Sequence, residues 1–186
     1  MKPVSILIFA FTLGFSTPAW SLGSVGVKGG TGFSILIVEP DPGADYVAPD
    51  ITPAVFGLTY TLSLVVAQVE VDLMFTRTTS SGGTPSVKKT AVNHLALPVI
   101  AKLQMPIIPA LAGLHFGLGA EARYQLDAKD GEEDIVFYLP VVLGADFDIQ
   151  LASASAELRY EHQMTDGITD NGTRVHQILF LLGASL

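Results

Sequence analysis

The chain has 186 residues, of which 49% are hydrophobic and only 15% charged, and its formal net charge is −8. That length fits one domain or two small ones, and the apolar fraction excludes a disordered chain. Because soluble domains carry about 25% charged residues, a surface that faces lipid has to be considered. The acidic balance argues against nucleic-acid binding, which needs clustered Lys and Arg. The chain has no cysteine, which excludes disulfides and thiol chemistry.

The first 21 residues have the features of an export signal. Lys2 supplies a positive start, residues 6–15 supply an apolar stretch, and residues 17–21 supply a small-residue end. A membrane anchor is the alternative, but the apolar stretch is shorter than the ~20 residues that a spanning helix needs. We therefore predict a signal peptide over 1–21, cleaved after Ala19 or Ser21, and an exported domain over 22–186.

Beyond this segment the apolar residues recur with period two. From Ala112 to Leu126, apolar side chains alternate with glycine or polar ones, which is the signature of a β-strand. The segment is long enough to cross a bilayer when tilted. It puts Leu118 on the apolar face and Gly119 on the other, where we expect a small polar residue to be tolerated. Seven similar segments complete a predicted set of eight strands: 24–34, 54–62, 67–77, 92–103, 135–147, 153–163 and 175–186.

The predicted connections alternate in length. Four are longer and polar, at 35–53, 78–91, 127–134 and 164–174, and three are mostly shorter, at 63–66, 104–111 and 148–152. Short turns on one side and long loops on the other are typical of an outer-membrane barrel. A helical span over Leu95–Leu118 is excluded because Pro98, Pro106 and Pro109 interrupt it. The predicted fold class is all-β, an eight-stranded antiparallel up-and-down transmembrane β-barrel.

A soluble periplasmic or secreted β-barrel with an apolar ligand inside is the alternative. Such a carrier would turn its apolar face inward, and alternation alone does not distinguish the two orientations. The polar face favours the membrane barrel, because it is rich in Gly, Ser and Thr with isolated charges of both signs. A soluble exterior is usually densely charged.

Three stretches of sequence resemble a known family. The segment Ser24–Ser34, with its Gly-Val-Lys-Gly-Gly core, resembles the opening strand of the bacterial outer-membrane β-barrel domain family that includes the PorT-like proteins and porin-family small barrels. His94–Leu103 is similar to the proline-containing middle strand of that family, and Leu118–Tyr124 to the strand that follows. The resemblance covers essentially the whole exported chain and implies a Gram-negative outer-membrane barrel.

If the apolar face points to lipid, the opposite face of each strand lines a narrow interior. The parity of a residue, that is, its odd or even position within its strand, decides the face to which it points. Parity places ten charged residues on this inward face: Lys28, Glu70, Asp72, Lys102, Glu121, Arg123, Asp146, Glu157, Arg159 and Glu161. Charges in a narrow lumen must be paired or hydrated, because an unpaired buried ion is costly. We predict that they form a structural ion-pair network that plugs the barrel. A catalytic carboxylate pair or a selective pore is the weaker hypothesis.

Metal and catalytic sites have little support in the sequence. The four histidines, at 94, 115, 162 and 176, lack the close spacing of a zinc site. A Ser–His–acid hydrolase would need His162 near the outer rim with Ser155 or a loop serine, and no nucleophile motif supports it. We therefore expect histidines that face lipid or lie at the rim, no metal site, no cofactor and no enzymatic activity.

The long connections are acidic. They hold 11 of the 18 acidic residues, namely Glu39, Asp41, Asp45, Asp50, Asp127, Asp130, Glu132, Glu133, Asp134, Asp166 and Asp170. The third connection, with five of these acids, has oxygen ligands but not the EF-hand spacing. We expect a solvated loop there, and the more specific alternative is that its acidic residues bind a divalent cation weakly. Lys88 and Lys89, in the second connection, are candidates for contact with anionic lipid headgroups.

Two prolines fall inside predicted strands. Pro98 and Pro140 each remove a hydrogen bond from the sheet ladder. We therefore expect a local β-bulge at both positions.

The sequence thus predicts a non-enzymatic, monomeric barrel in the bacterial outer membrane with a filled, non-conducting interior. Its expected partners are outer-membrane lipid and lipopolysaccharide, the barrel-assembly machinery, and a surface partner met by the acidic loops. Its expected role is structural or one of surface contact.

Overall fold

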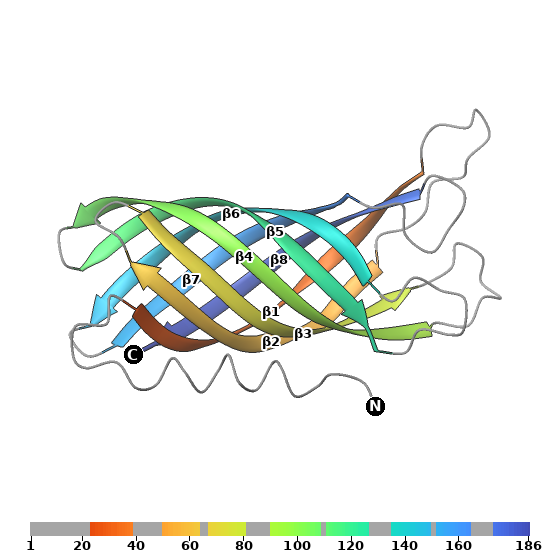
Figure 1. Cartoon of the computed structure of the whole chain (residues 1–186), viewed down its shortest axis with the longest axis horizontal. Helices are drawn as coiled ribbons and strands as arrows, with labels where there is room; N and C mark the ends of the chain where they lie inside the picture. The colour runs from red at the N-terminus through yellow and green to blue at the C-terminus, as the bar shows by residue number, and fades with distance from the viewer. Residues whose placement is uncertain are drawn as a thin grey trace.

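Eight long strands form a closed barrel in the computed structural model of the chain (Figure 1). The structure describes residues 23–38, 50–63, 67–80, 90–108, 111–126, 135–149, 152–164 and 173–186. The strands are β1 (Gly23–Val38), β2 (Asp50–Ser63), β3 (Ala67–Ser80), β4 (Thr90–Ile108), β5 (Ala112–Gln125), β6 (Ile135–Ile149), β7 (Ala152–Gln163) and β8 (Thr173–Ser185). Each strand pairs antiparallel with the next and β8 pairs with β1, which confirms the predicted eight-stranded antiparallel barrel. None of the described residues belongs to a helix long and apolar enough to cross a membrane.

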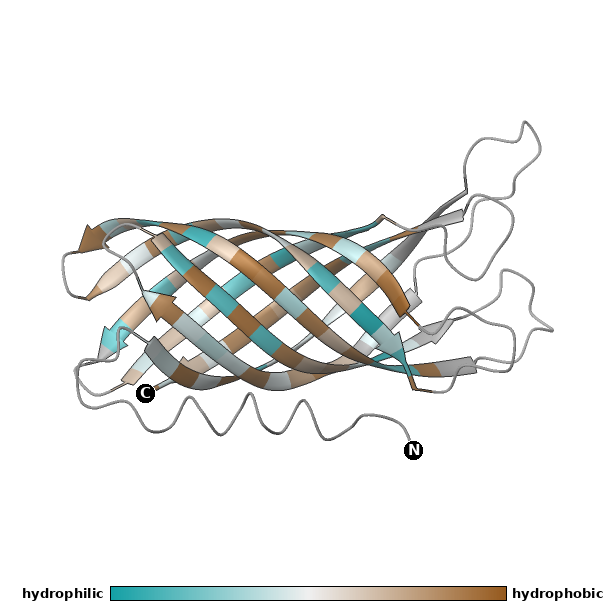
Figure 2. Ribbon diagram, viewed as in Figure 1, coloured by the Kyte–Doolittle hydropathy of each residue, from teal (hydrophilic) through white to brown (hydrophobic). Residues whose placement is uncertain are grey.

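The strands form because successive side chains point to opposite faces of the sheet. Along β5, Leu114, Phe116 and Leu118 are exposed on the outer wall, whereas His115 and Glu121 are buried inside. Figure 2 shows the same succession of hydrophobic and hydrophilic positions along the other strands. The result is an apolar outer wall around an interior that holds the charged side chains, as the period-two pattern predicts.

The two ends of the barrel differ in the length of their connections. Segments 39–49, 81–89, 126–134 and 164–172 join strands at one end, the long-connection end, and 64–66, 109–111 and 150–151 join them at the other, the short-connection end. The largest errors in the predicted boundaries are at three strand ends: β1 continues to Val38, β2 begins at Asp50, and β4 continues to Ile108 through the predicted turn. Backbone pairing continues beyond the alternating apolar residues, since Asp50 is opposite Ser34 and Pro106 is opposite Gly113.

The bulges expected at Pro98 and Pro140 do not occur in the described ladders. Pro98 is opposite Glu121 and Pro140 is opposite Glu161, both in unbroken register. On the other side of each proline, pairing is interrupted for two residues and then resumes without a shift. The missing amide hydrogen is therefore accommodated by a short gap in one ladder, which needs no extra residue. Register shifts occur elsewhere, between Gly30 and Gly32 and between Pro106 and Ile108.

Glycine at 119 is required by the close approach of β4. A Cβ there would lie 2.8 Å from the Ile100 Cα and still closer to the Val99 carbonyl oxygen. The expectation that a small polar residue is tolerated at Gly119 is therefore wrong, because the neighbouring atoms are backbone and cannot rotate away. At Gly113 on the same face, an added Cβ would be in ordinary contact, 3.4 Å from the Met105 carbonyl oxygen.

The seam of the barrel joins β1 to β8. Its ladder runs from Gly26 opposite Ser185 to Val38 opposite Thr173, and Val25 and Leu186 extend it by exchanging backbone hydrogen bonds of 3.3 and 3.0 Å. Gly30 sits in this seam, where an added Cβ would lie 2.9 Å from the Phe180 carbonyl carbon. The glycine-rich sequence of β1 thus lets its backbone approach β8 without an intervening side chain.

Candidate functional site

The barrel interior is the candidate site, because polar side chains from most of the strands are buried there. All ten charged residues selected by parity lie on the inward face, nine of them buried and Asp146 half-buried. Nine form two groups. The central cluster contains Lys28, Glu70, Asp72, Lys102, Glu157 and Arg159, and the Arg123 cluster contains Glu121, Arg123 and Glu161.

The central cluster is balanced in charge, with three cations and three carboxylates contributed by β1, β3, β4 and β7. The Lys28 Nζ lies 2.5 Å from the Glu70 Oε1 and 2.9 Å from the Glu157 Oε1. The Lys102 Nζ lies 2.6 Å from the Glu70 Oε2 and also contacts Glu157. Two lysines thus share two glutamates across the lumen, an arrangement that compensates ions withdrawn from water.

Arg159 joins the remaining carboxylate to this group. Its Nη2 donates to the Asp72 Oδ2 at 2.8 Å and to the Glu157 Oε2 at 3.2 Å, and lies 3.4 Å from the Glu70 Oε1. Its Nη1 contacts the Met74 Sδ at 3.6 Å. The Arg159 side chain is fully buried, so one guanidinium serves three carboxylates without access to solvent.

His115 lies inside the barrel and extends the central cluster, so the expectation that the histidines face lipid or lie at the rim is wrong for this residue. Its Nδ1 lies 2.8 Å from the Asp146 Oδ2 and its Nε2 lies 3.4 Å from the Glu157 Oε1. Gln104 also donates to Asp146, at 3.4 Å. The alternation along β5 already places His115 on the inward face, and this was the sequence feature that could have predicted its buried position. Spacing rules for metal ligands do not detect a histidine whose partners come from other strands.

The Arg123 cluster contains one cation and two carboxylates. The Arg123 Nη2 donates to the Glu161 Oε2 at 2.6 Å and also contacts Glu121, and the Nη1 donates to the Gln177 Oε1 at 2.6 Å. The guanidinium carbon lies 4.2 Å from the centre of the Tyr138 ring, a cation–π contact. Each of the three guanidinium nitrogens therefore has a hydrogen-bond partner, and the Gln177 amide donates in turn to the Ser34 hydroxyl at 2.7 Å.

Apolar side chains fill another part of the interior. Five buried residues contact one another there: Val55, Met74, Ala96, Leu179 and Leu181. The Met74 sulfur lies against the Arg159 guanidinium, so this group adjoins the central cluster. Parity alone predicted charges on the inward face but not this apolar packing, which occupies volume that the ion pairs leave.

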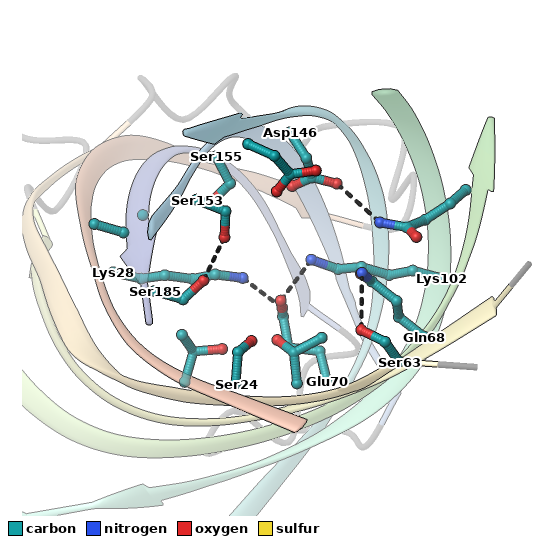
Figure 3. Close-up of a pocket in the computed structure, with 16 residues that line it drawn as sticks. Ser24, Lys28, Ser63, Gln68, Glu70, Lys102, Asp146, Ser153, Ser155 and Ser185 are labelled. Carbon is teal, nitrogen blue, oxygen red and sulfur yellow. Dashed lines mark hydrogen bonds and ion pairs between the residues drawn. The ribbon is translucent and has the colours of Figure 1, made fainter. Parts of the chain in front are cut away.

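A polar pocket of about 340 Å³ opens next to the central cluster (Figure 3). Its lining is rich in hydroxyl and carboxamide groups, with Lys28, Glu70 and Lys102 among the charged residues; the uncharged polar residues are Ser24, Thr59, Thr61, Ser63, Gln68, Gln104, Ser153, Ser155 and Ser185. These residues lie toward the short-connection end of their strands. The described lining includes no member of the Arg123 cluster, so the pocket ends at the central cluster.

The outer histidines lie on the wall near the long-connection end. His162 and His176 are opposite one another on β7 and β8, and their rings are 4.7 Å apart. Ser155 lines the interior pocket, seven positions along β7 from His162 and on the other face of the sheet, so the structure does not bring these two residues together. Within the described part of the chain, no three His, Asp or Glu side chains are grouped to hold a metal ion.

Several sequence predictions concern residues outside the described ranges. They are the signal segment 1–21, the acidic group Asp127, Asp130, Glu132, Glu133 and Asp134, the lysines Lys88 and Lys89, and the acids Glu39, Asp41, Asp45, Asp166 and Asp170.

No family model matches the chain, and no curated protein matches it. Three solved structures are similar to it. The outer membrane protein OprG from Pseudomonas aeruginosa is 14% identical, with a TM-score of 0.54 over 88% of this chain and 94% of that chain. Neisserial surface protein A is 13% identical, with a TM-score of 0.51 over 88% and 96%. Ail, the attachment invasion locus protein of Yersinia pestis, is 15% identical, with a TM-score of 0.49 over 88% and 99%. At these identities, the likeness to OprG and Neisserial surface protein A shows a shared barrel fold.

Proposed function

We propose that this chain is a small integral outer-membrane β-barrel protein with a plugged, non-conducting interior and a structural or surface-contact role. The observation that carries the proposal is the polarity of the barrel, which is apolar outside and ionised inside. The similarity in fold to an outer membrane protein and to a surface protein supports the same location.

The outer wall is unsuited to water. Large apolar side chains remain exposed along the strands, among them Phe116 at 47%, Leu118 at 50% and Leu143 at 54%. A continuous apolar surface of this kind marks a membrane or protein interface. Because exposed apolar side chains occupy outward-facing positions on every described strand except β3, where the outward apolar residues are half-buried, a bilayer is the solvent that fits this wall best.

The interior argues against the alternative of a soluble carrier for an apolar ligand. Such a carrier needs an apolar cavity, whereas the pocket here is lined by hydroxyls, carboxamides and charges. Lys28, Glu70 and Lys102 at its inner end are paired with one another, so that end of the pocket presents charges to a lipid chain.

The same interior supports a closed barrel. Eight strands enclose a lumen only wide enough for side chains to fill. The two clusters join strands that are not neighbours in the sheet, as in the pairs of Lys28 on β1 with Glu70 on β3 and of Lys102 on β4 with Glu157 on β7. A water-filled channel generally needs about sixteen strands.

The finer parts of the proposal rest on the sequence. They are membership of the PorT-like or porin-family small barrels, export by the signal at 1–21, insertion by the barrel-assembly machinery, a monomeric state, and contact of the acidic connections with lipopolysaccharide or a surface partner. We propose no enzymatic activity and no cofactor.

Membrane integration is tested by fractionation. We expect the protein to stay with outer membranes after a carbonate wash, and to migrate differently on gels with and without boiling, because closed barrels resist unfolding in detergent. Release into detergent-free buffer together with identical migration would contradict the proposal.

The closed interior is tested separately in planar lipid bilayers. We expect no steady ion current from the reconstituted protein, because ion pairs and apolar side chains occupy the lumen beyond the pocket. A heat-modified gel shift on the same preparation shows that the barrel is folded. Long-lived, well-resolved conductance steps from that folded preparation would overturn the closed barrel while leaving membrane integration intact.

A further inference from the structure

Two histidines face each other on the outside of the barrel. His162 on β7 and His176 on β8 are directly opposite in the antiparallel register, and both are half-buried on the outward face. Directly opposite residues in such a pair have Cβ atoms about 4.5–5.5 Å apart. The two rings are accordingly close, with centroids 4.7 Å apart and planes inclined by 49°.

The facing nitrogen atoms have the separation of two ligands on one metal ion. The His162 Nδ1 and the His176 Nδ1 are 3.4 Å apart. Two nitrogens bound to Zn²⁺ at about 2.0–2.1 Å, with a tetrahedral angle between them, are roughly 3.3–3.4 Å apart. The pair therefore needs only small side-chain adjustments to hold an ion between its rings.

A third donor lies at the same place. The Tyr160 hydroxyl contacts the His176 Nδ1, and its ring centroid is 5.8 Å from that of His176. Tyr160 is two positions before His162 on β7, so both side chains project from the same face of one strand. Two imidazoles and a phenol oxygen form a donor set for late first-row divalent ions, because imidazole suits zinc, copper and nickel.

From this geometry we propose that His162, His176 and Tyr160 form a surface site for a divalent transition-metal ion, Zn²⁺ or Cu²⁺, on the outer wall near the long-connection end. The site is reachable, since Tyr160 is exposed and both histidines are partly so. It lies where β7 ends and β8 begins, which in the proposed membrane orientation is the headgroup level rather than the hydrocarbon centre. A bound ion would link β7 to β8 beside the connection that joins them.

The site is tested by titrating Zn²⁺ into the full chain in detergent micelles, followed by calorimetry. Excess Ca²⁺ is kept in the buffer to occupy oxygen sites in the acidic connections, which prefer hard cations. We expect a single zinc site whose affinity falls at least tenfold in His162→Ala and in His176→Ala, because even second-shell partners of a metal contribute roughly 10- to 100-fold. Tyr160→Phe should weaken binding less than either histidine variant.

The control is His94→Ala, which removes a histidine from β4 at a position that alternates with outward-facing Leu95. It should leave the zinc affinity unchanged. Electron paramagnetic resonance of the Cu²⁺-loaded protein should show coupling to two imidazole nitrogens in the unmodified chain, and this pattern should be lost in both outer-histidine variants. Heat-modified gel migration verifies that each variant is folded. The proposal would be overturned if zinc did not bind, or if folded His162→Ala and His176→Ala bound zinc as tightly as the unmodified chain.

Discussion

Arg159→Ala is expected to lower the free energy of unfolding by about 3–5 kcal/mol, the usual cost of removing one partner from a buried ion pair. Arg159 is fully buried and its Nη2 lies within 3.4 Å of three carboxylates. Without it, the central cluster holds two cations against three acids, and Asp72 loses its 2.8 Å partner, with only Lys28 left near it at 3.8 Å. Urea unfolding in lipid vesicles, followed by circular dichroism and gel migration, measures the loss.

Two further variants separate this effect from the simple loss of an arginine. Arg77→Ala removes an exposed arginine from β3 and should change stability by no more than about 0.5 kcal/mol. Combining Arg159→Ala with Asp72→Asn should cost less than the sum of the two single changes, because the double variant no longer holds a charged Asp72 without its arginine. Strict additivity would show that Arg159 does not stabilise the barrel through its pair with Asp72.

Leu118→Arg is expected to cost about 2–4 kcal/mol, because it places a charge on the lipid face near the middle of the membrane. Leu118 is 50% exposed and lies at the seventh of the 14 positions of β5, midway between the two barrel ends. Unfolding in vesicles gives the cost, and the fraction of protein that inserts during refolding gives an independent measure.

Leu111→Arg is the matched control. Leu111 is 52% exposed and immediately precedes β5 at the short-connection end, where an arginine reaches the interface and should cost only about 0–1 kcal/mol. The comparison keeps residue type and exposure nearly constant and changes depth, together with the step from the strand to the turn that precedes it. Similar costs at the two positions would mean that the outer wall does not face a bilayer.

The number of strands, the face to which each side chain points and the identity of the inward charges can be predicted from the local sequence. Alternation along β5 is enough to assign Leu118 to the wall and Glu121 to the interior, because side-chain direction in a strand depends only on position. The long and short connections likewise follow from where the alternation stops. Strand ends extend further than predicted, since backbone pairing at Asp50 and Pro106 does not depend on apolar side chains.

Features that depend on neighbouring strands could not be predicted in this way. Position 119 does not accept a side chain because the backbone of β4 passes close to it. Pro98 needs no bulge because the pairing of β4 with β3 is interrupted beside it. The partners of His115 are on β6 and β7, and the pairing of His162 with His176 depends on a register set across a long connection. Each of these requires knowledge of inter-strand register, which period-two alternation does not contain.

The seam between β1 and β8 also determines the order in which the barrel can fold. It joins the first and last strands of the chain, and the Lys28–Glu157 ion pair spans 129 positions of sequence. Contacts of such separation form late, because a long loop must close before they stabilise anything. Until then the inward charges lie on one face of an open sheet, where water can still solvate them.

Closure is thus the step at which hydration of these ions is exchanged for pairing. Before closure, β1 and β8 each present an unpaired edge, which is a template for association with other chains. With no side chain at Gly30 to displace, β8 can dock along β1 directly and shorten the lifetime of that exposed edge. A side chain introduced at this glycine would clash with the β8 backbone in the closed seam, and so would also delay the docking of the last strand and lengthen the time during which copies of the chain can aggregate.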